Sequence, residues 1–244
     1  MKIFKKVLNS IVFLPTLLFL PSSLADTLFR PDKLEVRFYE MGFRNSESGE
    51  FASVFSNSNG VVIDLSSPES VQTLSSNVNL SNTGTFDQMY VLVSNTVLIS
   101  GNKDGCYIKG GEYSYNEGNI PAATSNSELA GTAIMTETGF GGEDASTSDI
   151  TTYRVSPAVS SSVNGVAVNN LLSYLVNGTN KNPGSGGPYN RYLYLGDLQS
   201  SINLDSSKEG TLWIDTDTSQ TAQLENDCTE MNWVNTKFGM SVEQ

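Results

Sequence analysis

Short apolar runs alternate with polar residues along most of this chain. Residues 34–38 place apolar and charged side chains in alternation, which is the pattern of a strand with one buried face. Residues 61–65 form a short apolar run directly after Asn59-Gly60, a pair that favours tight hairpin turns. The pattern therefore predicts short strands joined by turns.

The clearest strand is expected over residues 84–100. Three alternating apolar residues, Met89, Val91 and Val93, share one face of this segment, and the polar pair Asp87-Gln88 stands just before them. We interpret the pair as the entry to a core strand, with side chains that hydrogen-bond the backbone of the turn opening the segment. The pair is then expected to serve the fold and not a site.

Further strands are predicted in the rest of the chain, and helix signals are few. The candidate strands cover residues 106–115, 131–138, 150–156, 163–168, 191–195, 201–204, 210–216 and 237–242. Short helices are expected at Ser67-Pro68-Glu69 and over residues 170–176, where Asn177-Gly178 would end the second one. Many short strands with regular turn signals predict an all-β fold, an immunoglobulin-like or jelly-roll-like antiparallel β-sandwich with one or two short helices.

Residues 1–25 have the pattern of a secretory signal peptide. Basic residues at Lys2, Lys5 and Lys6 precede an apolar run over residues 11–20, and small residues precede Asp26. The apolar run is too short for an ordinary membrane-spanning helix, and no second such run follows it. We therefore expect cleavage before Asp26, no transmembrane segment afterwards, and a secreted, periplasmic or cell-surface location. An uncleaved anchor is the alternative.

The remaining residues 26–244 are long enough to bury one large core, and we expect a single β-sandwich domain. The chain has two cysteines, Cys106 and Cys228, and export together with an even count predicts one disulfide between them. A sub-boundary near residues 119–126 would give two halves, which that disulfide would tie together. Two separate buried thiols are the alternative to the disulfide.

The chain is acidic, with 26 Asp and Glu against 14 Lys and Arg and a net charge of −12. Such a chain repels phosphate backbones, so nucleic acid is not expected as a partner. The acidity is typical of a soluble protein outside the cytoplasm, and it also offers carboxylates for calcium. A solvated acidic surface is the simpler alternative.

Three segments of the N-terminal half occur in a distinctive order. LEVRFYEMGF at residues 34–43 is followed by VVIDL at residues 61–65, and GTFDQMY at residues 84–90 then leads into the long strand. This order resembles a family of secreted bacterial β-sandwich domains of unknown function, over residues 33–100 only. Phe86 stands where that family usually has Tyr, and Met89 where it usually has Ile. The resemblance implies an immunoglobulin-like or transthyretin-like sandwich at the cell envelope, and it carries over no catalytic residue.

The composition excludes several kinds of chemistry. The chain has no histidine, which excludes Ser-His-Asp and Cys-His catalysis and every His-based zinc site. With both cysteines in a disulfide, a thiol nucleophile is not expected either. The arrangement that remains for an enzyme is a pair of carboxylates, as in glycoside hydrolysis. Because the commonest catalytic groups are excluded, we expect no catalytic residues.

The candidate ligand-binding residues are Trp213, Asp215 and Asp217. In a strand these alternating positions share one face, with the two carboxylates about 7 Å apart along the chain. The carboxylates would suit a cation or a sugar hydroxyl, and the indole would offer a stacking platform. The alternative is the solvent face of a strand that buries Leu212 and Ile214.

The same acidic stretch is a candidate calcium site. Asp215, Asp217 and Asp227 would supply the oxygen donors that calcium prefers. The segment is not an EF-hand loop, because Gln220 and Asn226 stand where that loop requires glycine and glutamate. No other cofactor is expected.

These observations predict a secreted or periplasmic, non-catalytic module of the envelope or surface that acts by binding or assembly. Its partner would be a protein or a glycan at the cell surface. Tyrosines cluster at residues 107–115 and 189–194, where they would suit either a partner-binding sheet face or ordinary packing. Two alternatives stay open: a carbohydrate-active enzyme or lectin-like glycan binder using paired carboxylates, and a structural subunit of a surface fibre or layer.

Overall fold

The computed structural model describes most of the chain after the expected signal peptide. The described residues are 27–66, 72–79, 82–115, 123–137, 161–163, 165–181, 188–207, 209–217, 222–224, 228, 231–233 and 237–243. The expected signal peptide, the helix at Ser67-Pro68-Glu69, the strand at residues 150–156 and the candidate ligand Asp227 all lie outside them.

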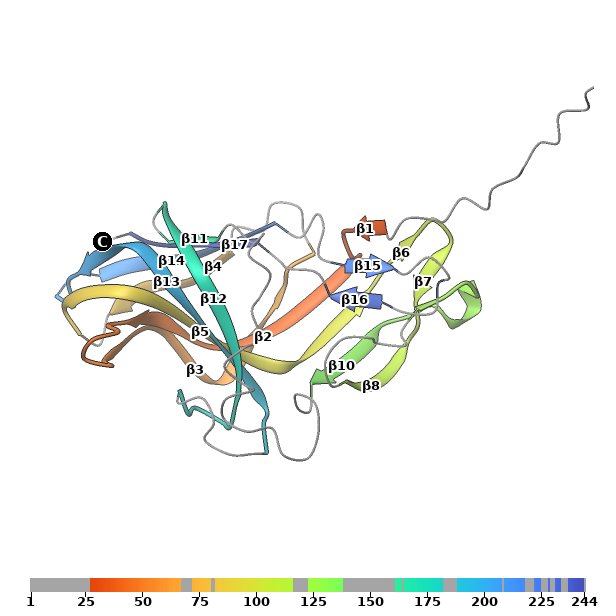
Figure 1. Cartoon of the computed structure of the whole chain (residues 1–244), viewed down its shortest axis with the longest axis horizontal. Coiled ribbons are helices and arrows are strands. Elements are labelled where there is room, and N and C mark those ends of the chain that lie inside the picture. Colours follow the sequence, from red (N-terminus) through yellow and green to blue (C-terminus); the bar gives the residue numbers. More distant parts are fainter. Residues whose placement is uncertain are drawn as a thin grey trace, which may run out of the picture.

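Within these residues the chain is β-structure almost throughout (Figure 1). The first nine strands are β1 (Thr27–Phe29), β2 (Lys33–Arg44), β3 (Phe51–Asp64), β4 (Gln72–Asn79), β5 (Gly84–Ser100), β6 (Asn102–Lys103), β7 (Cys106–Ile108), β8 (Gly111–Tyr115) and β9 (Ala123–Thr124). The others are β10 (Ala133–Glu137), β11 (Ser161–Val163), β12 (Val166–Val176), β13 (Arg191–Leu204), β14 (Glu209–Asp217), β15 (Ala222–Leu224), β16 (Met231–Trp233) and β17 (Lys237–Glu243). The described residues include no α-helix, and the one short turn of 3-10 helix is η1 (Ser127–Leu129).

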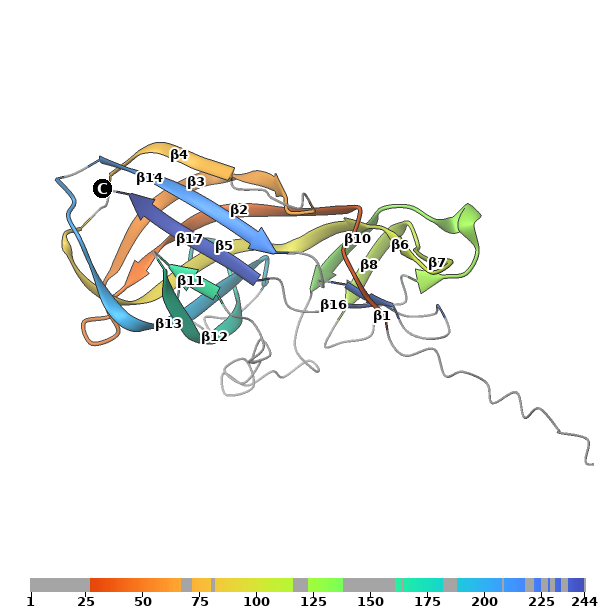
Figure 2. The ribbon, with the colours of Figure 1, turned by 90° about the horizontal axis from the view of Figure 1, so that it is seen from above.

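The largest sheet has 11 strands. Its main path runs β3-β2-β5-β13-β12-β11-β17-β14-β4, and β10 and β8 continue from β5 as a branch. The sheet folds over on itself, so that β4, β14 and β17 form one layer and β3, β2 and β5 the other (Figures 1 and 2). The predicted all-β sandwich is therefore confirmed. Most neighbours are antiparallel, but β10 with β8 and β11 with β17 are parallel pairs.

The long strand predicted at residues 84–100 is β5, which lies between β2 and β13. Met89, Val91 and Val93 are buried in the main apolar core, as expected. Tyr90 and Leu92 are also fully buried, in a second apolar cluster. Because successive side chains of a strand alternate, β5 is covered on both faces. We call the face of the sheet that carries Tyr90 and Leu92 the outer face.

The helix expected over residues 170–176 is wrong, because this segment is the second half of β12 and pairs with β13. Tyr174, Leu175 and Val176 are all buried. Consecutive apolar residues here mark a strand covered on both sides, which apolar content alone does not distinguish from a helix face. The pair Asn177-Gly178 still makes a turn, in which Gly178 has a φ of 59°.

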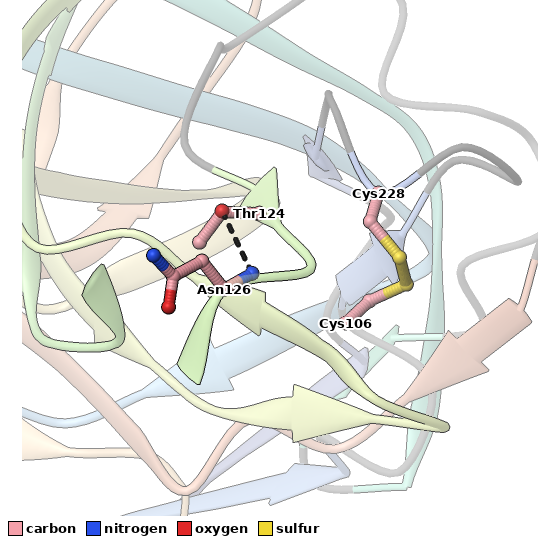
Figure 3. The surroundings of a disulfide bond; sticks show 4 residues. All are labelled: Cys106, Thr124, Asn126 and Cys228. Atoms are coloured by element: carbon pink, nitrogen blue, oxygen red, sulfur yellow. Dashed lines mark hydrogen bonds between the residues drawn. A yellow bond between two sulfur atoms is a disulfide. The ribbon is translucent and has the colours of Figure 1, made fainter. Parts of the chain in front are cut away.

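Two small sheets form the other end of the molecule, one with the order β1-β15-β16 and one with the order β6-β7-β9 (Figure 1). The predicted disulfide joins them: Cys106 on β7 bonds Cys228 between β15 and β16, with the two Cα atoms 5.2 Å apart (Figure 3). Beside it, the Asn126 N–H donates to the Thr124 hydroxyl at 3.1 Å. The sub-boundary expected near residues 119–126 is described only from residue 123 onward. This part includes β9, which pairs with β7.

Candidate functional site

The sequence-predicted site residues lie on one strand. Trp213, Asp215 and Asp217 belong to β14, where the register with β17 pairs Asp215 with Gly239 and Asp217 with Lys237. Their side chains, like all of Asp227, lie outside the part that the structure describes. The glycan and calcium interpretations of these residues therefore stay predictions. Among the residues whose side chains are described, no group of three or more Cys, Asp or Glu side chains is placed to hold a metal ion.

A different cluster stands out in the described part of the chain, centred on the outer face of β2, β5, β13 and β12 and reaching past the strand ends. An outward face of an antiparallel sheet is usually polar, but this one carries a second apolar cluster with aromatic rings around it. Its buried members are Tyr90, Leu92, Tyr174, Leu175, Val176 and Leu193, and its partly buried members are Tyr39, Phe51, Tyr189, Tyr192 and Leu195.

A β-bulge in β2 brings Glu40 to this face. Phe38 pairs with Val93 of β5, but Glu40 pairs with Leu92, so the residue between them has no partner in the register. An extra residue reverses the alternation of the strand. Phe38 therefore packs in the main core, while the Glu40 side chain reaches Tyr90 on the outer face. Simple alternation places Glu40 beside Phe38, so sequence reasoning missed this carboxylate.

Glu40, Tyr90 and Lys181 form a polar trio in which Glu40 and Tyr90 are buried and Lys181 is partly buried. The Tyr90 hydroxyl donates to Oε1 of Glu40 at 2.6 Å, and the Lys181 ammonium donates to the same oxygen in an ion pair. Lys181 Nζ also lies 3.5 Å from the Tyr90 hydroxyl oxygen. Burial, and then the neighbouring Glu40, raise the pKa of Tyr90 well above its usual value. Tyr90 therefore remains a protonated donor.

Aromatic rings enclose the Lys181 ammonium. Phe51 meets Tyr90 edge to face, with ring centroids 5.1 Å apart. Lys181 Nζ lies 5.0 Å from the Phe51 centroid and 4.9 Å from the Tyr90 centroid, within the range of cation–π attraction. Gly42 pairs with Tyr90 across the strands, and a Cβ at Gly42 would lie 2.8 Å from Tyr90 Cε1. The missing side chain of Gly42 thus makes room for the Tyr90 ring.

A polar row crosses the same face next to the trio. Arg44, Gln88 and Asp197 lie opposite one another on β2, β5 and β13. Nη1 of Arg44 donates to Oε1 of Gln88, and Nε2 of Gln88 donates to Oδ1 of Asp197 at 2.7 Å. Gln88 thus connects three strands, and its partners among the described residues lie on β2 and β13, whereas the sequence suggested the turn before β5.

Asp87, the other half of the polar pair, also has a different partner from the one expected. Its carboxylate accepts the Ser46 backbone N–H at 2.7 Å and the Ser46 hydroxyl. Ser46 lies in the turn between β2 and β3, so Asp87 fixes that hairpin to β5. Burial raises the pKa of Asp87, but the hydrogen bonds from Ser46 and the attraction of Arg44 outweigh it and hold the pKa below its usual value.

Two arginines stack on rings of the outer face. Arg191 Cζ lies 3.5 Å from the centroid of Tyr39, and Arg44 Cζ lies 5.6 Å from that of Phe51. Nη1 of Arg191 is buried without a hydrogen-bond partner. Tyr39, Phe51 and both arginines are half-buried. The face therefore offers ring surfaces and guanidinium donors, a combination suited to recognition.

The comparisons add no relative. No protein-family model, no curated protein and no solved structure matches this chain. The resemblance of residues 33–100 to secreted β-sandwich domains stays a prediction. No helix among the described residues is long and apolar enough to cross a membrane.

Proposed function

We propose that this protein is an exported, non-catalytic module of the cell envelope or surface, and that its outer face binds a protein or glycan partner. The observation that supports this most is the stacking of Arg191 on Tyr39 and of Arg44 on Phe51, with all four side chains only partly buried. Tyr and Arg are the residues most enriched where binding energy is concentrated in interfaces.

The chemistry of the face favours binding over bond-making. One oxygen of Glu40 already accepts hydrogen bonds from Tyr90 and Lys181, and Asp197 accepts one from Gln88. The chain has no histidine to act as a general base. Rings can instead stack on a sugar or on an apolar side chain, while guanidinium groups donate to carboxylate or hydroxyl oxygens.

Export is supported by two features. The sequence of residues 1–25 has the pattern of a signal peptide. Cys106 and Cys228 are paired, and a structural disulfide of this kind persists in oxidising compartments. The proposed location is the periplasm or the cell surface.

Binding can be tested with the mature chain immobilised on a sensor surface. The probes are neutral and uronic-acid oligosaccharides and envelope fragments of the producing cell. The double variant Tyr39→Ala, Phe51→Ala should lose roughly tenfold or more in affinity for the probe that binds. The matched control is Tyr107→Ala, which removes a half-buried tyrosine of β7 in a small sheet and should bind as the wild type does.

Two results would contradict the proposal. Equal affinity of all three proteins for the bound probe would move the binding surface away from the outer face. Release of shorter products from an oligosaccharide by the wild type would show that the protein is an enzyme. Circular dichroism of each variant checks that the sheet is intact.

A further inference from the structure

We propose that Lys181 and Glu40 condense into an amide, an intramolecular cross-link between β2 and the connection from β12 to β13. The trio of Glu40, Tyr90 and Lys181 holds the amine nitrogen on a carboxylate oxygen in a largely buried setting. The inference is independent of what the outer face binds.

The first support is the confinement of the pair. The side chains of Lys181 and Glu40 retain only 23% and 11% of their exposure, and the rings of Phe51 and Tyr90 flank the amine. Intramolecular groups held in a near-attack geometry can reach effective concentrations of about 10⁵ to 10⁸ M. Such confinement favours condensation, which dilute acids and amines in water do not undergo.

The second support is the position of Tyr90. Its buried hydroxyl donates at 2.6 Å to Oε1 of Glu40, the oxygen that also accepts from the Lys181 ammonium and that would leave as water. A hydrogen-bond donor fixed at that oxygen stabilises the negative charge that develops on it as its bond to Cδ breaks. Because the pKa of Tyr90 is raised by burial and by Glu40, the donor keeps its proton.

The reaction balances without any further reactant. A proton passes from the Lys181 ammonium to Oε1 of Glu40, the oxygen that it already contacts, giving an amine and a carboxylic acid, and desolvated lysine amines are competent nucleophiles. Nζ attacks Cδ, which forms the C–N bond and places charge on the other carboxyl oxygen. The bond from Cδ to Oε1 then breaks, the C=O bond re-forms at the other oxygen, and Oε1 leaves as water with a second proton from Nζ. One carboxylate and one ammonium give one amide and one water.

Tryptic peptides of the reduced mature protein provide the test. Trypsin should release residues 38–44, which contain Glu40, and should cut after Lys181 to separate residues 155–181 from 182–191. An amide at Lys181 blocks that cut. We therefore expect a branched product in which residues 38–44 are joined to residues 155–191, with the summed mass less one water.

Two variants serve as controls, and both should give the ordinary linear peptides. Lys181→Arg keeps the positive charge but removes the amine, and Glu40→Ala removes the acid. Tyr90→Phe keeps both reactive groups and should accumulate the chain without the cross-link. The wild type decides the matter even if a variant misfolds: free residues 38–44 with complete cutting after Lys181 would overturn the proposal.

Discussion

A methyl group at Gly42 should destabilise this fold more than a methyl group at another strand glycine. Gly42 lies on β2 opposite Tyr90 of β5 and Ser53 of β3. A Cβ there would overlap the carbonyl oxygen of Ala52, and it would lie 2.8 Å from Tyr90 Cε1 and 2.9 Å from Ser53 Cα. Two of these three neighbours are backbone atoms, so a change of side-chain rotamer cannot relieve the overlap.

The magnitude follows from the cost of overpacking. Extra methyl groups in a packed core usually cost about 1 to 3 kcal/mol, and backbone obstruction puts Gly42→Ala at the upper end. Replacing glycine also restricts the unfolded chain, which returns about 0.5 kcal/mol. We expect a net loss of roughly 2 to 2.5 kcal/mol in the free energy of unfolding, or roughly 4 to 10 °C in melting temperature.

Gly84→Ala is the matched control. Gly84 opens β5, and a Cβ there would meet its nearest neighbour, Phe86 Cζ, at an ordinary 3.5 Å. This variant should match the wild type within about 0.5 kcal/mol. Urea unfolding followed by circular dichroism gives both values from the midpoint and slope. If Gly42→Ala were no less stable than Gly84→Ala, the packing described for Tyr90 against β2 would be incorrect.

Three further predictions concern other parts of the molecule. Replacing Cys106 and Cys228 together by Ser should lower the free energy of unfolding by about 2 to 5 kcal/mol, the upper figure being the chain-entropy value for a disulfide that spans 122 positions of the chain. Urea midpoints unaffected by the replacement would contradict this. Because the folded pKa of Asp87 is lowered, its contribution to stability is complete above about pH 4 and is lost as the pH falls through the folded pKa. Asp87→Asn should therefore be less stable than the wild type near neutral pH and similar to it in strong acid, and a difference independent of pH would refute the role of the charge. If the carboxylates of β14 bind calcium, the ion should raise the melting temperature of the wild type but not that of the double variant Asp215→Asn, Asp217→Asn; unchanged melting of the wild type would end the calcium interpretation.

The fold class could be predicted because its signals are local. Alternation over residues 34–38 and the alternating apolar residues within 84–100 both mark strands, and they correspond to β2 and β5. The disulfide followed from a count of two cysteines in a chain with an export signal. None of these inferences needs knowledge of which strand lies beside which.

The outer face could not be predicted because it depends on register between distant segments. The bulge after Phe38 has no local marker, yet it decides that Glu40 meets Tyr90, 50 positions away. Lys181 comes from a turn 141 positions beyond Glu40. Residues 170–176 show the same limit, since burial of β12 on both sides made its apolar run look like a helix face.

The most direct test of binding by the outer face is oxidative footprinting of the mature protein, free in solution and bound to the surface of the cells that make it. Hydroxyl radicals modify accessible aromatic side chains, and mass spectrometry gives the rate at each one. We predict that Tyr39 and Phe51 become severalfold less reactive on the bound protein while Tyr107 is unchanged. Protection of Tyr107 with unaltered reactivity of Tyr39 and Phe51 would contradict the proposed function.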